Sequence, residues 1–234
     1  MIRTVAETGS TNADMLLLAR AGAEEGLWLR AERQTAGRGR QGRAWTSPPG
    51  NLSASTLVRV RPTDAAAASL ALMAAVALHE TVSVYLGSAA RAVLKWPNDL
   101  LVAGAKLSGI LLERVDDAVV IGIGVNLAHH PDLPDRATTS LAAQGATVAP
   151  ADLLETLAEA VGRWLSRWRG EGLSPIRSAW LDAAHPIGTA LSARLPDGST
   201  ADGLFDGLDA HGALILRLAT GERRVIHAAD VFLL

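Results

Sequence analysis

The sequence contains no cysteine, which excludes a disulfide scaffold and a zinc site built on thiolates. It also has no excess of one charge sign. Its 22 Lys and Arg residues stand against 24 Asp and Glu residues, so the formal net charge is −2. This balance disfavours a globally basic nucleic-acid-binding protein, although it leaves room for a local basic patch.

Long hydrophobic runs are missing as well. The longest covers residues 65–78, interrupted only by Ser69, and is shorter than the roughly 20 residues that cross a bilayer, so we expect a buried core helix. The first residues, Met1 to Val5, lack the apolar segment of a signal peptide. These absences predict a soluble, cytoplasmic protein that makes no contact with membranes.

The composition that remains is globular, with 49% hydrophobic and 20% charged residues in a chain of 234. That length favours one large domain, or one large domain with a small appendage. After Pro186 the chain changes to short β-type runs separated by turn signals such as Pro196-Asp197-Gly198. We therefore expect a large domain over residues 1–185 and a small barrel of five strands over 186–234.

Hydrophobic periodicity predicts a mixture of strands and helices in the first part of the chain. The expected strands are residues 2–6, 27–33, 52–61, 91–96, 107–115 and 118–127, and the expected helices are 10–21, 64–86, 151–168 and 174–183. Residues 34–50 and 128–150 are expected to be irregular. A structureless segment as long as 34–50 is usually functional in a compact domain.

The segment from Gln34 to Trp45 reads QTAGRGRQGRAW and concentrates positive charge on a glycine-rich backbone. Glycines let N–H groups approach an anion closely, and guanidinium groups bind phosphate oxygens in pairs. The spacing of its glycines satisfies G-x-G-x-x-G, but no helix follows, so a dinucleotide-binding fold is not indicated. Trp45 can stack on a base. A solvated linker and an RNA-binding segment are the alternatives.

Three further segments carry polar residues beside apolar strands: KWPND at 95–99, KLSGILLE at 106–113 and GIGVNL at 122–127. Lys95 is either an edge residue or a charge aimed at a ligand. Glycines that alternate with β-branched residues in a strand indicate close backbone approach. Asn126 is either a turn residue or a hydrogen-bonding partner for a base edge.

Together with Ser10-Thr11-Asn12, these segments resemble the bacterial biotin protein ligases in order and spacing over residues 10–127. The resemblance implies an α+β fold, in which a mixed sheet and helices form a class II synthetase-like, biotin–lipoate ligase catalytic domain. It also implies a small C-terminal SH3-like β-barrel. Only nine residues precede Ser10, so we expect a monofunctional ligase that lacks the N-terminal DNA-binding domain of some relatives and binds no DNA.

The resemblance also implies a reaction in two steps. Biotin and MgATP give biotinyl-5′-adenylate, and the biotinyl group then passes to a lysine of the biotin carboxyl carrier domain of acetyl-CoA carboxylase or a related carboxylase. Mg²⁺ is expected to be held mostly by phosphate oxygens, with no protein ligand assigned. A lipoate–protein ligase is the nearest alternative and an RNA-binding module a more distant one. Pairing of two subunits through an edge strand stays open.

Site residues follow from the same resemblance. Lys95 and Arg40 are the expected catalytic residues. The expected biotin-binding residues are Ser10, Thr11, Asn12, Gln34, Gly37, Arg38, Arg40, Lys95, Gly109, Gly122 and Gly124, and those for ATP and the adenylate are Arg38, Arg40, Arg43, Trp45, Lys95, Asn98, Lys106 and Asn126. Because residues 186–234 hold none of these motifs, we expect them to dock a partner or brace the ATP side without forming the chemical site.

Overall fold

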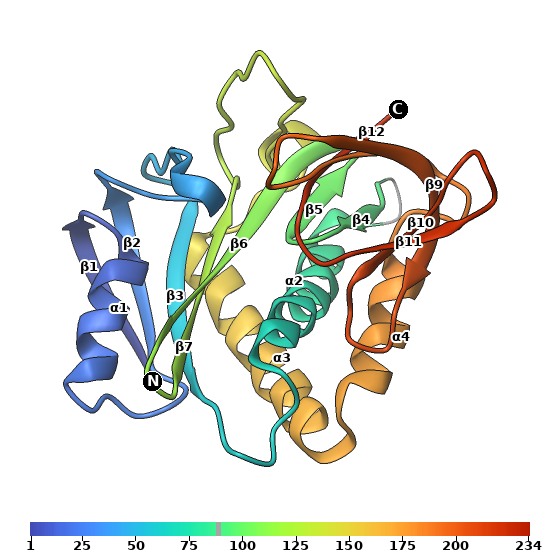
Figure 1. Cartoon of the computed structure of the whole chain (residues 1–234). Helices are drawn as coiled ribbons and strands as arrows, with labels where there is room; N and C mark the ends of the chain where they lie inside the picture. The colour runs from blue at the N-terminus through green and yellow to red at the C-terminus, as the bar shows by residue number, and fades with distance from the viewer. Residues whose placement is uncertain (88–89) are drawn as a thin grey trace.

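The structure is a computed structural model that describes residues 1–87 and 90–234. Its larger part is a seven-stranded sheet with the order β1-β2-β3-β7-β6-β5-β4 (Figure 1). Strands β1 and β2 pair in parallel and the other neighbours are antiparallel. The strands are β1 (Ile2–Thr8), β2 (Trp28–Gln34), β3 (Leu52–Arg59), β4 (Ala92–Lys95), β5 (Asp99–Val102), β6 (Ala105–Val115) and β7 (Ala118–Val125).

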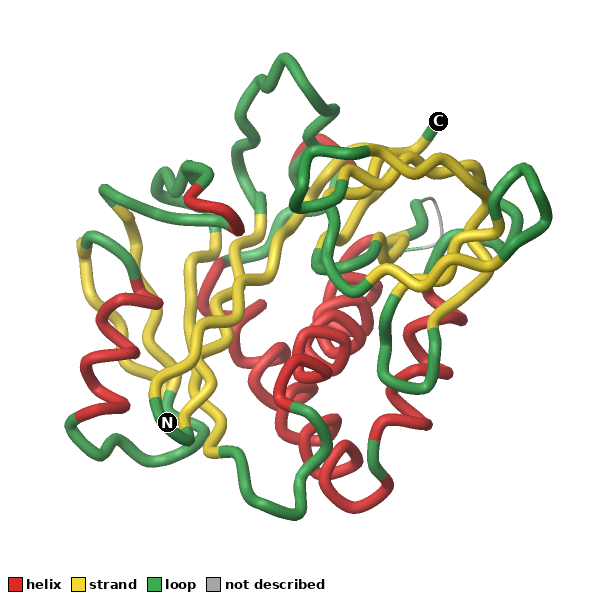
Figure 2. Tube along the Cα trace, viewed as in Figure 1, coloured by secondary structure: helices red, strands yellow, loops and turns green. Residues whose placement is uncertain are grey.

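Within residues 1–87 and 90–234, four α-helices accompany this sheet. Figure 2 draws them in red together with the short 3-10 turns. The α-helices are α1 (Thr11–Arg20), α2 (Leu70–Leu86), α3 (Pro150–Glu171) and α4 (Leu173–Ala183). Short 3-10 turns lie at Arg40–Gly42, Ala67–Ser69 and Ala142–Gln144. Helix α2 packs against α3 and α4, whereas α1 packs against β3, β6 and β7.

The sheet separates two hydrophobic clusters, because successive side chains of a strand point to opposite faces. Trp28 and Val58 belong to the large cluster that contains α2, α3 and α4. Leu29 and Leu57, their neighbours in the chain, belong to the smaller cluster under α1. In the centre of the sheet, each strand therefore contributes to both layers.

The same alternation decides which face of β7 carries glycine. Ile121 and Ile123 point into the large cluster, and Val120 points into the cluster under α1. Gly122 and Gly124 share the face of Val120. On the α1 side the sheet surface is therefore apolar near Val120 and bare of side chains farther along β7.

Helix α2 is the buried core helix expected from the apolar run. The stretch Ala67–Leu86 is long and apolar enough to cross a membrane, but much of it is buried inside the protein. The sequence predicted a helix from residue 64, whereas the α-helix begins at Leu70 after a 3-10 turn. Its packing against α3 and α4 explains its apolar surface.

The last part of the chain forms a second sheet of five antiparallel strands, as predicted in number. They are β8 (Ala190–Arg194), β9 (Thr200–Leu208), β10 (Leu214–Arg217), β11 (Arg223–Ile226) and β12 (Asp230–Leu233), in the order β11-β10-β9-β8-β12. Its apolar residues join the large cluster, where the rings of Trp180 and Phe205 meet edge to face at 6.4 Å. Trp96 Nε1 also donates to the Gly212 carbonyl at 3.1 Å.

Two expectations were wrong in detail. The sequence analysis missed β5, whose four residues follow β4 after only three connecting residues, because so short a strand carries too little periodicity. The first of the last two helices was expected to end at residue 168, but α3 continues to Glu171 with Gly170 inside it. The break occurs at Gly172 alone, whose φ of 75° few other residues adopt.

Candidate active site

A cavity of about 280 Å³ opens on the α1 side of the sheet. It collects residues from the N-terminus of α1, the β2–β3 loop, the β4–β5 turn, β6, β7 and β12. Every site residue named from the sequence lines it except Gly37. The fifteen are Ser10, Thr11, Asn12, Gln34, Arg38, Arg40, Arg43, Trp45, Lys95, Asn98, Lys106, Gly109, Gly122, Gly124 and Asn126.

One end of the cavity is a network of uncharged hydrogen-bonding groups. Gln34 Oε1 accepts from the Thr11 backbone N–H at 2.8 Å and from Thr11 Oγ1 at 3.1 Å. Gln34 Nε2 donates to Ser47 Oγ at 2.8 Å, and Ser53 Oγ donates to the same oxygen at 2.9 Å. Ser55 Oγ lies within hydrogen-bonding distance of Thr11 Oγ1, at 2.7 Å. The network fixes the first turn of α1 against β2 and β3.

Asn12 is held beside this network by hydrogen bonds to three neighbours. Its Nδ2 donates to Glu113 Oε2 at 2.9 Å and to the Leu111 carbonyl at 3.4 Å, and its Oδ1 accepts from Ser55 Oγ at 2.6 Å. A Cβ on Gly122 would lie 2.1 Å from Asn12 Oδ1. The absence of a side chain at position 122 is therefore what lets Asn12 lie on the sheet.

Trp45 lies on the sheet two residues farther along β7. A Cβ on Gly124 would lie 2.4 Å from Trp45 Cε2, and a Cβ on Gly109 would lie 3.6 Å from Trp45 Cζ3. Gly37, although expected to contact biotin, is not among the lining residues. A Cβ there would lie 2.5 Å from the Trp45 carbonyl oxygen. Gly37 thus allows two strands of the loop to approach, which places Trp45.

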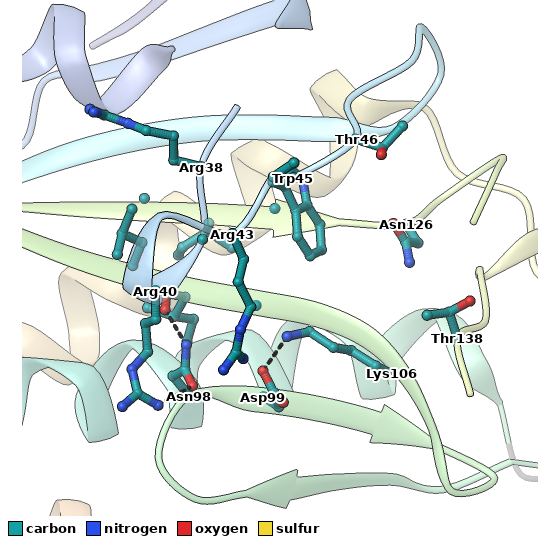
Figure 3. A pocket seen from close by; sticks show the side chains of 18 of the residues that line it. Arg38, Arg40, Arg43, Trp45, Thr46, Asn98, Asp99, Lys106, Asn126 and Thr138 are labelled. Atoms are coloured by element: carbon teal, nitrogen blue, oxygen red, sulfur yellow. Dashed lines mark hydrogen bonds and ion pairs between the residues drawn. The ribbon is translucent and has the colours of Figure 1, made fainter. Parts of the chain in front are cut away.

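Two lysines share one buried carboxylate in the floor of the cavity, and Figure 3 shows the contact of one of them, Lys106, with Asp99. Lys106 Nζ contacts Asp99 Oδ1 at 2.5 Å and Lys95 Nζ contacts Asp99 Oδ2 at 3.3 Å. Burial lowers the pKa of Lys95 despite the nearby Asp99. Burial alone would raise the pKa of Asp99, but the two ammonium groups more than offset this and lower it. Lys106 also lies 5.8 Å from the centre of the Trp45 ring.

The loop between β2 and β3 carries Arg38, Arg40 and Arg43, and we call it the arginine-rich loop. It is attached to the C-terminal sheet. Arg40 donates to the Ala229 carbonyl at 3.3 Å and to Asn98 Oδ1 at 3.3 Å, and Arg43 forms an ion pair with Asp230. Lys95 Nζ donates to the Val231 carbonyl at 2.9 Å. Arg38 points away from the other two arginines and lies 3.7 Å from Glu113 (Figure 3).

Residues 186–234 were expected to dock a partner or brace the ATP side without forming the chemical site, and only the last part of this expectation was wrong. Asp230, Val231 and Phe232 line the cavity. No local pattern marks these residues, because two of them are ordinary apolar members of a short strand. Only the packing of β12 beside the β4–β5 turn and the arginine-rich loop brings them to the cavity.

Asn126 directly follows β7. Its Nδ2 donates to the Thr139 carbonyl at 3.0 Å, whereas its buried Oδ1 has no hydrogen-bonding partner among the residues that the structure describes. The backbone that follows is held by Asn51, whose Oδ1 accepts from the N–H groups of residues 127, 128 and 129, each at 3.0 Å. A buried carbonyl oxygen without a partner is costly unless a ligand donates to it.

Sequence reasoning also missed the segment from Pro131 to Thr138, which forms one wall of the cavity. Its residues have no hydrophobic period and no motif, so they were expected only to be irregular. The segment is fixed to β6, since the Lys106 N–H donates to the Ala137 carbonyl and the Thr139 N–H donates to the Lys106 carbonyl, both at 2.9 Å. From the sequence, Asp99 was named only as the last residue of the KWPND segment and was not expected in the site.

Comparison with known families gives two matches. A model described as the Biotin/lipoate A/B protein ligase family matches residues 7–126, and one described as the Biotin protein ligase C terminal domain matches residues 187–234. A biotin--[acetyl-CoA-carboxylase] ligase of Paracoccus denitrificans is 43% identical and covers 97% of this chain and 98% of that protein. The protein of that name from Mycobacterium tuberculosis is 36% identical over 97% of this chain and 86% of its own length.

Solved structures agree with these matches. Biotin protein ligase from Aquifex aeolicus, in complex with biotin and ATP, has a TM-score of 0.87 with 22% identity and covers 100% of this chain and 99% of that one. The Leishmania major enzyme with biotinyl-5-AMP has a TM-score of 0.69 with 26% identity, over 97% and 98% of the two chains. The resemblance expected from the motifs is confirmed: this chain belongs to the biotin/lipoate protein ligase family, and its C-terminal part to the biotin protein ligase C-terminal domains.

Proposed function

We propose that this protein is a biotin protein ligase. It joins biotin to ATP as biotinyl-5′-adenylate, releases pyrophosphate, and transfers the biotinyl group to a lysine of a biotin carboxyl carrier domain. The observation that carries the proposal is a single cavity with an uncharged hydrogen-bonding end, an aromatic end and two lysines in its floor. The catalytic part is proposed to span residues 1–185, with residues 186–234 completing the site.

The uncharged end suits the biotin ring system. Thr11, Asn12 and Gln34 are fixed by hydrogen bonds among themselves and to the sheet. Such preorganised donors and acceptors can bind a polar, uncharged ureido group without further ordering. Gly122 leaves the space that Asn12 occupies on β7, so the Asn12 amide can line the cavity beside a ligand.

The aromatic end suits the nucleotide. Trp45 offers a face for stacking, and Lys106 lies close to the ring. The free Oδ1 of Asn126 accepts a hydrogen bond, so it matches the amino group of adenine. The amide of Asn126 is held in this orientation, because rotating it would place Oδ1 against the Thr139 carbonyl oxygen.

The lysines lie between these two ends, where the chemistry needs positive charge. The carboxylate of biotin attacks the α-phosphorus of ATP while the bond to the pyrophosphate oxygen breaks. Both reactants are anionic, so Lys95 and Lys106 lower their repulsion and stabilise the charge of the transition state. Asp99 fixes both ammonium groups, which removes the need to reorganise them during the reaction. Mg²⁺ supplies further neutralisation of the phosphates, whose oxygens are proposed to hold it.

The arginine-rich loop is proposed to shield the adenylate from water until the carrier lysine attacks its carbonyl and AMP leaves. Arg40 is the catalytic residue of this loop. Its attachment to Ala229 and Asn98 places it over the cavity near Lys95. The proposed partner is the carrier domain of acetyl-CoA carboxylase or a related carboxylase, in the cytoplasm.

The test is ATP-dependent transfer of labelled biotin to a carrier domain, together with biotin-dependent pyrophosphate exchange. Calorimetric titrations with biotin, lipoate and an RNA oligomer separate the alternatives. We expect binding and transfer of biotin only. Transfer of lipoate in place of biotin, or binding of RNA without any exchange, would overturn the proposal.

A further inference from the structure

Arg136 is a cavity residue to which the proposed reaction has so far given no role. It lies on the wall formed by residues 131–138, and its side chain is 23% exposed. The backbone next to it is fixed, since residues 137–139 pair with Lys106. Its charge acts on Lys95, whose pKa it helps to lower, and on Asp99 and Asp230. Arg136 therefore belongs to the charged centre of the cavity.

The other cations of this centre are already held by the protein. Lys95 and Lys106 contact the buried Asp99, Arg43 pairs with Asp230, and Arg40 donates to a carbonyl and an amide oxygen. Arg136 instead pairs with its neighbour Asp135, whose side chain is 55% exposed, at 3.1 Å and 2.5 Å. An ion pair with so exposed a carboxylate contributes little stability, so Arg136 can exchange this partner for another anion.

The position of Arg136 fits one part of the substrate. Arg38 and Thr138 lie on opposite sides of the cavity with Lys106 and Asp99 between them (Figure 3). Arg38 is near Asn12 and Glu113, at the uncharged end. Arg136 lies on the same wall of the cavity as Thr138, two residues before it in the chain, and its charge reaches Lys95, Asp99 and Asp230. In a phosphoryl substitution the leaving oxygen lies roughly in line with the attacking one, on the opposite side of phosphorus.

Resting on the proposed function, we propose that Arg136 binds the β- and γ-phosphates of ATP and stabilises the departing pyrophosphate. Its planar guanidinium can contact two phosphate oxygens at once. On binding, it leaves Asp135 for these oxygens. The residue acts in adenylate formation only, because the second half-reaction no longer contains pyrophosphate.

The test compares the two half-reactions in Arg136→Ala. We expect the KM for ATP in biotin-dependent pyrophosphate exchange to rise about 10-fold or more, as for loss of one charged hydrogen-bonding group. In the overall biotinylation reaction, inhibition by added pyrophosphate, which is a product, should weaken by a similar factor. The KM for biotin, and the rate of transfer from preformed biotinyl-5′-adenylate to the carrier domain, should stay unchanged. Arg136→Lys should recover part of the ATP affinity.

Two variants serve as matched controls. Asp135→Asn removes the partner of Arg136 and should not raise the KM for ATP. Arg167→Ala breaks a similar surface pair, with Glu171 in α3, and should change neither half-reaction.

An unchanged KM for ATP in Arg136→Ala would overturn the assignment. An equal loss of rate in transfer from preformed biotinyl-5′-adenylate would also overturn it, since general damage to the cavity wall would then explain the loss in both half-reactions. Absence of exchange in the wild-type protein would contradict the proposed function itself, which is a different result.

Discussion

Arg43 in the loop after β2 forms an ion pair with Asp230 at the start of β12, across 187 positions of the sequence. The Asp230 carboxylate is largely buried, whereas the Arg43 side chain is 41% exposed. The pair joins the arginine-rich loop to the C-terminal sheet at the edge of the cavity. It makes the order of the loop depend on the last strand of the chain.

Asp230→Ala should loosen the arginine-rich loop. The variant removes the carboxylate that holds Arg43, and few apolar contacts remain in the loop to order it. Limited trypsin digestion at Arg38, Arg40 and Arg43 should therefore be several-fold faster than in the wild type without ligands. Biotin and ATP together should remove most of this difference. Equal cleavage rates in the free proteins would show that the ion pair does not order the loop.

Lys95→Ala and Lys106→Ala should each reduce biotin-dependent pyrophosphate exchange by about 100-fold or more, as for removal of one preorganised charge-stabilising donor. The two variants should differ in stability. Lys95 also donates to the Val231 carbonyl and so helps to hold the C-terminal sheet. The ammonium group of Lys106 donates to Asp99 in the large domain. Thermal unfolding should therefore show a larger loss for Lys95→Ala. Near-normal exchange in either folded variant would contradict its proposed role.

Gly122→Ala and Gly124→Ala should impair different substrates, although they lie two residues apart on one strand. The new methyl at 122 collides with Asn12, and the one at 124 collides with Trp45. Overpacking of this kind displaces the neighbour at a cost of about 1–3 kcal/mol. We expect a raised KM for biotin from Gly122→Ala and a raised KM for ATP from Gly124→Ala. Steady-state exchange kinetics test this, and equal effects on both substrates would refute it.

Mild acid should destabilise the protein through His79. Burial lowers the pKa of His79 below the ordinary value of 6.5, and the nearby charge of Arg91 adds to this, although the contact of the ring with the Ala92 carbonyl at 3.2 Å and the nearby Glu80 oppose it. The unfolded chain then binds a proton at a higher pH than the folded protein. This contribution to stability is present above pH 6.5 and is lost as the pH falls through the lowered pKa.

Urea unfolding at several pH values measures this effect. His79→Gln retains a donor for the Ala92 carbonyl but does not titrate, so its free energy of unfolding should fall less steeply below pH 6.5. His185, whose pKa burial also lowers, should leave a residual slope of the same sign in the variant. An unchanged slope in His79→Gln would show that His79 does not contribute.

The sequence by itself determined the family, the mixed fold and fifteen of the residues that line the cavity. Motifs such as GRGRQGRAW and KWPND combine residue types that suit the binding of an anionic ligand. Because each motif is a short segment, its residues lie near one another in any fold. The buried helix α2 and the five C-terminal strands could also be predicted, because hydrophobic periodicity and turn residues act over a few positions.

Only the tertiary structure decided how these segments act on one another. Gly37 was expected at the ligand, yet its place under the Trp45 carbonyl depends on how the loop folds back. Asp230 and Arg136 carry no motif, since their importance comes from elements that lie next to them in space but far away in the chain. Burial of Asp99 between two lysines likewise arises from the pairing of β4, β5 and β6, which no single segment encodes.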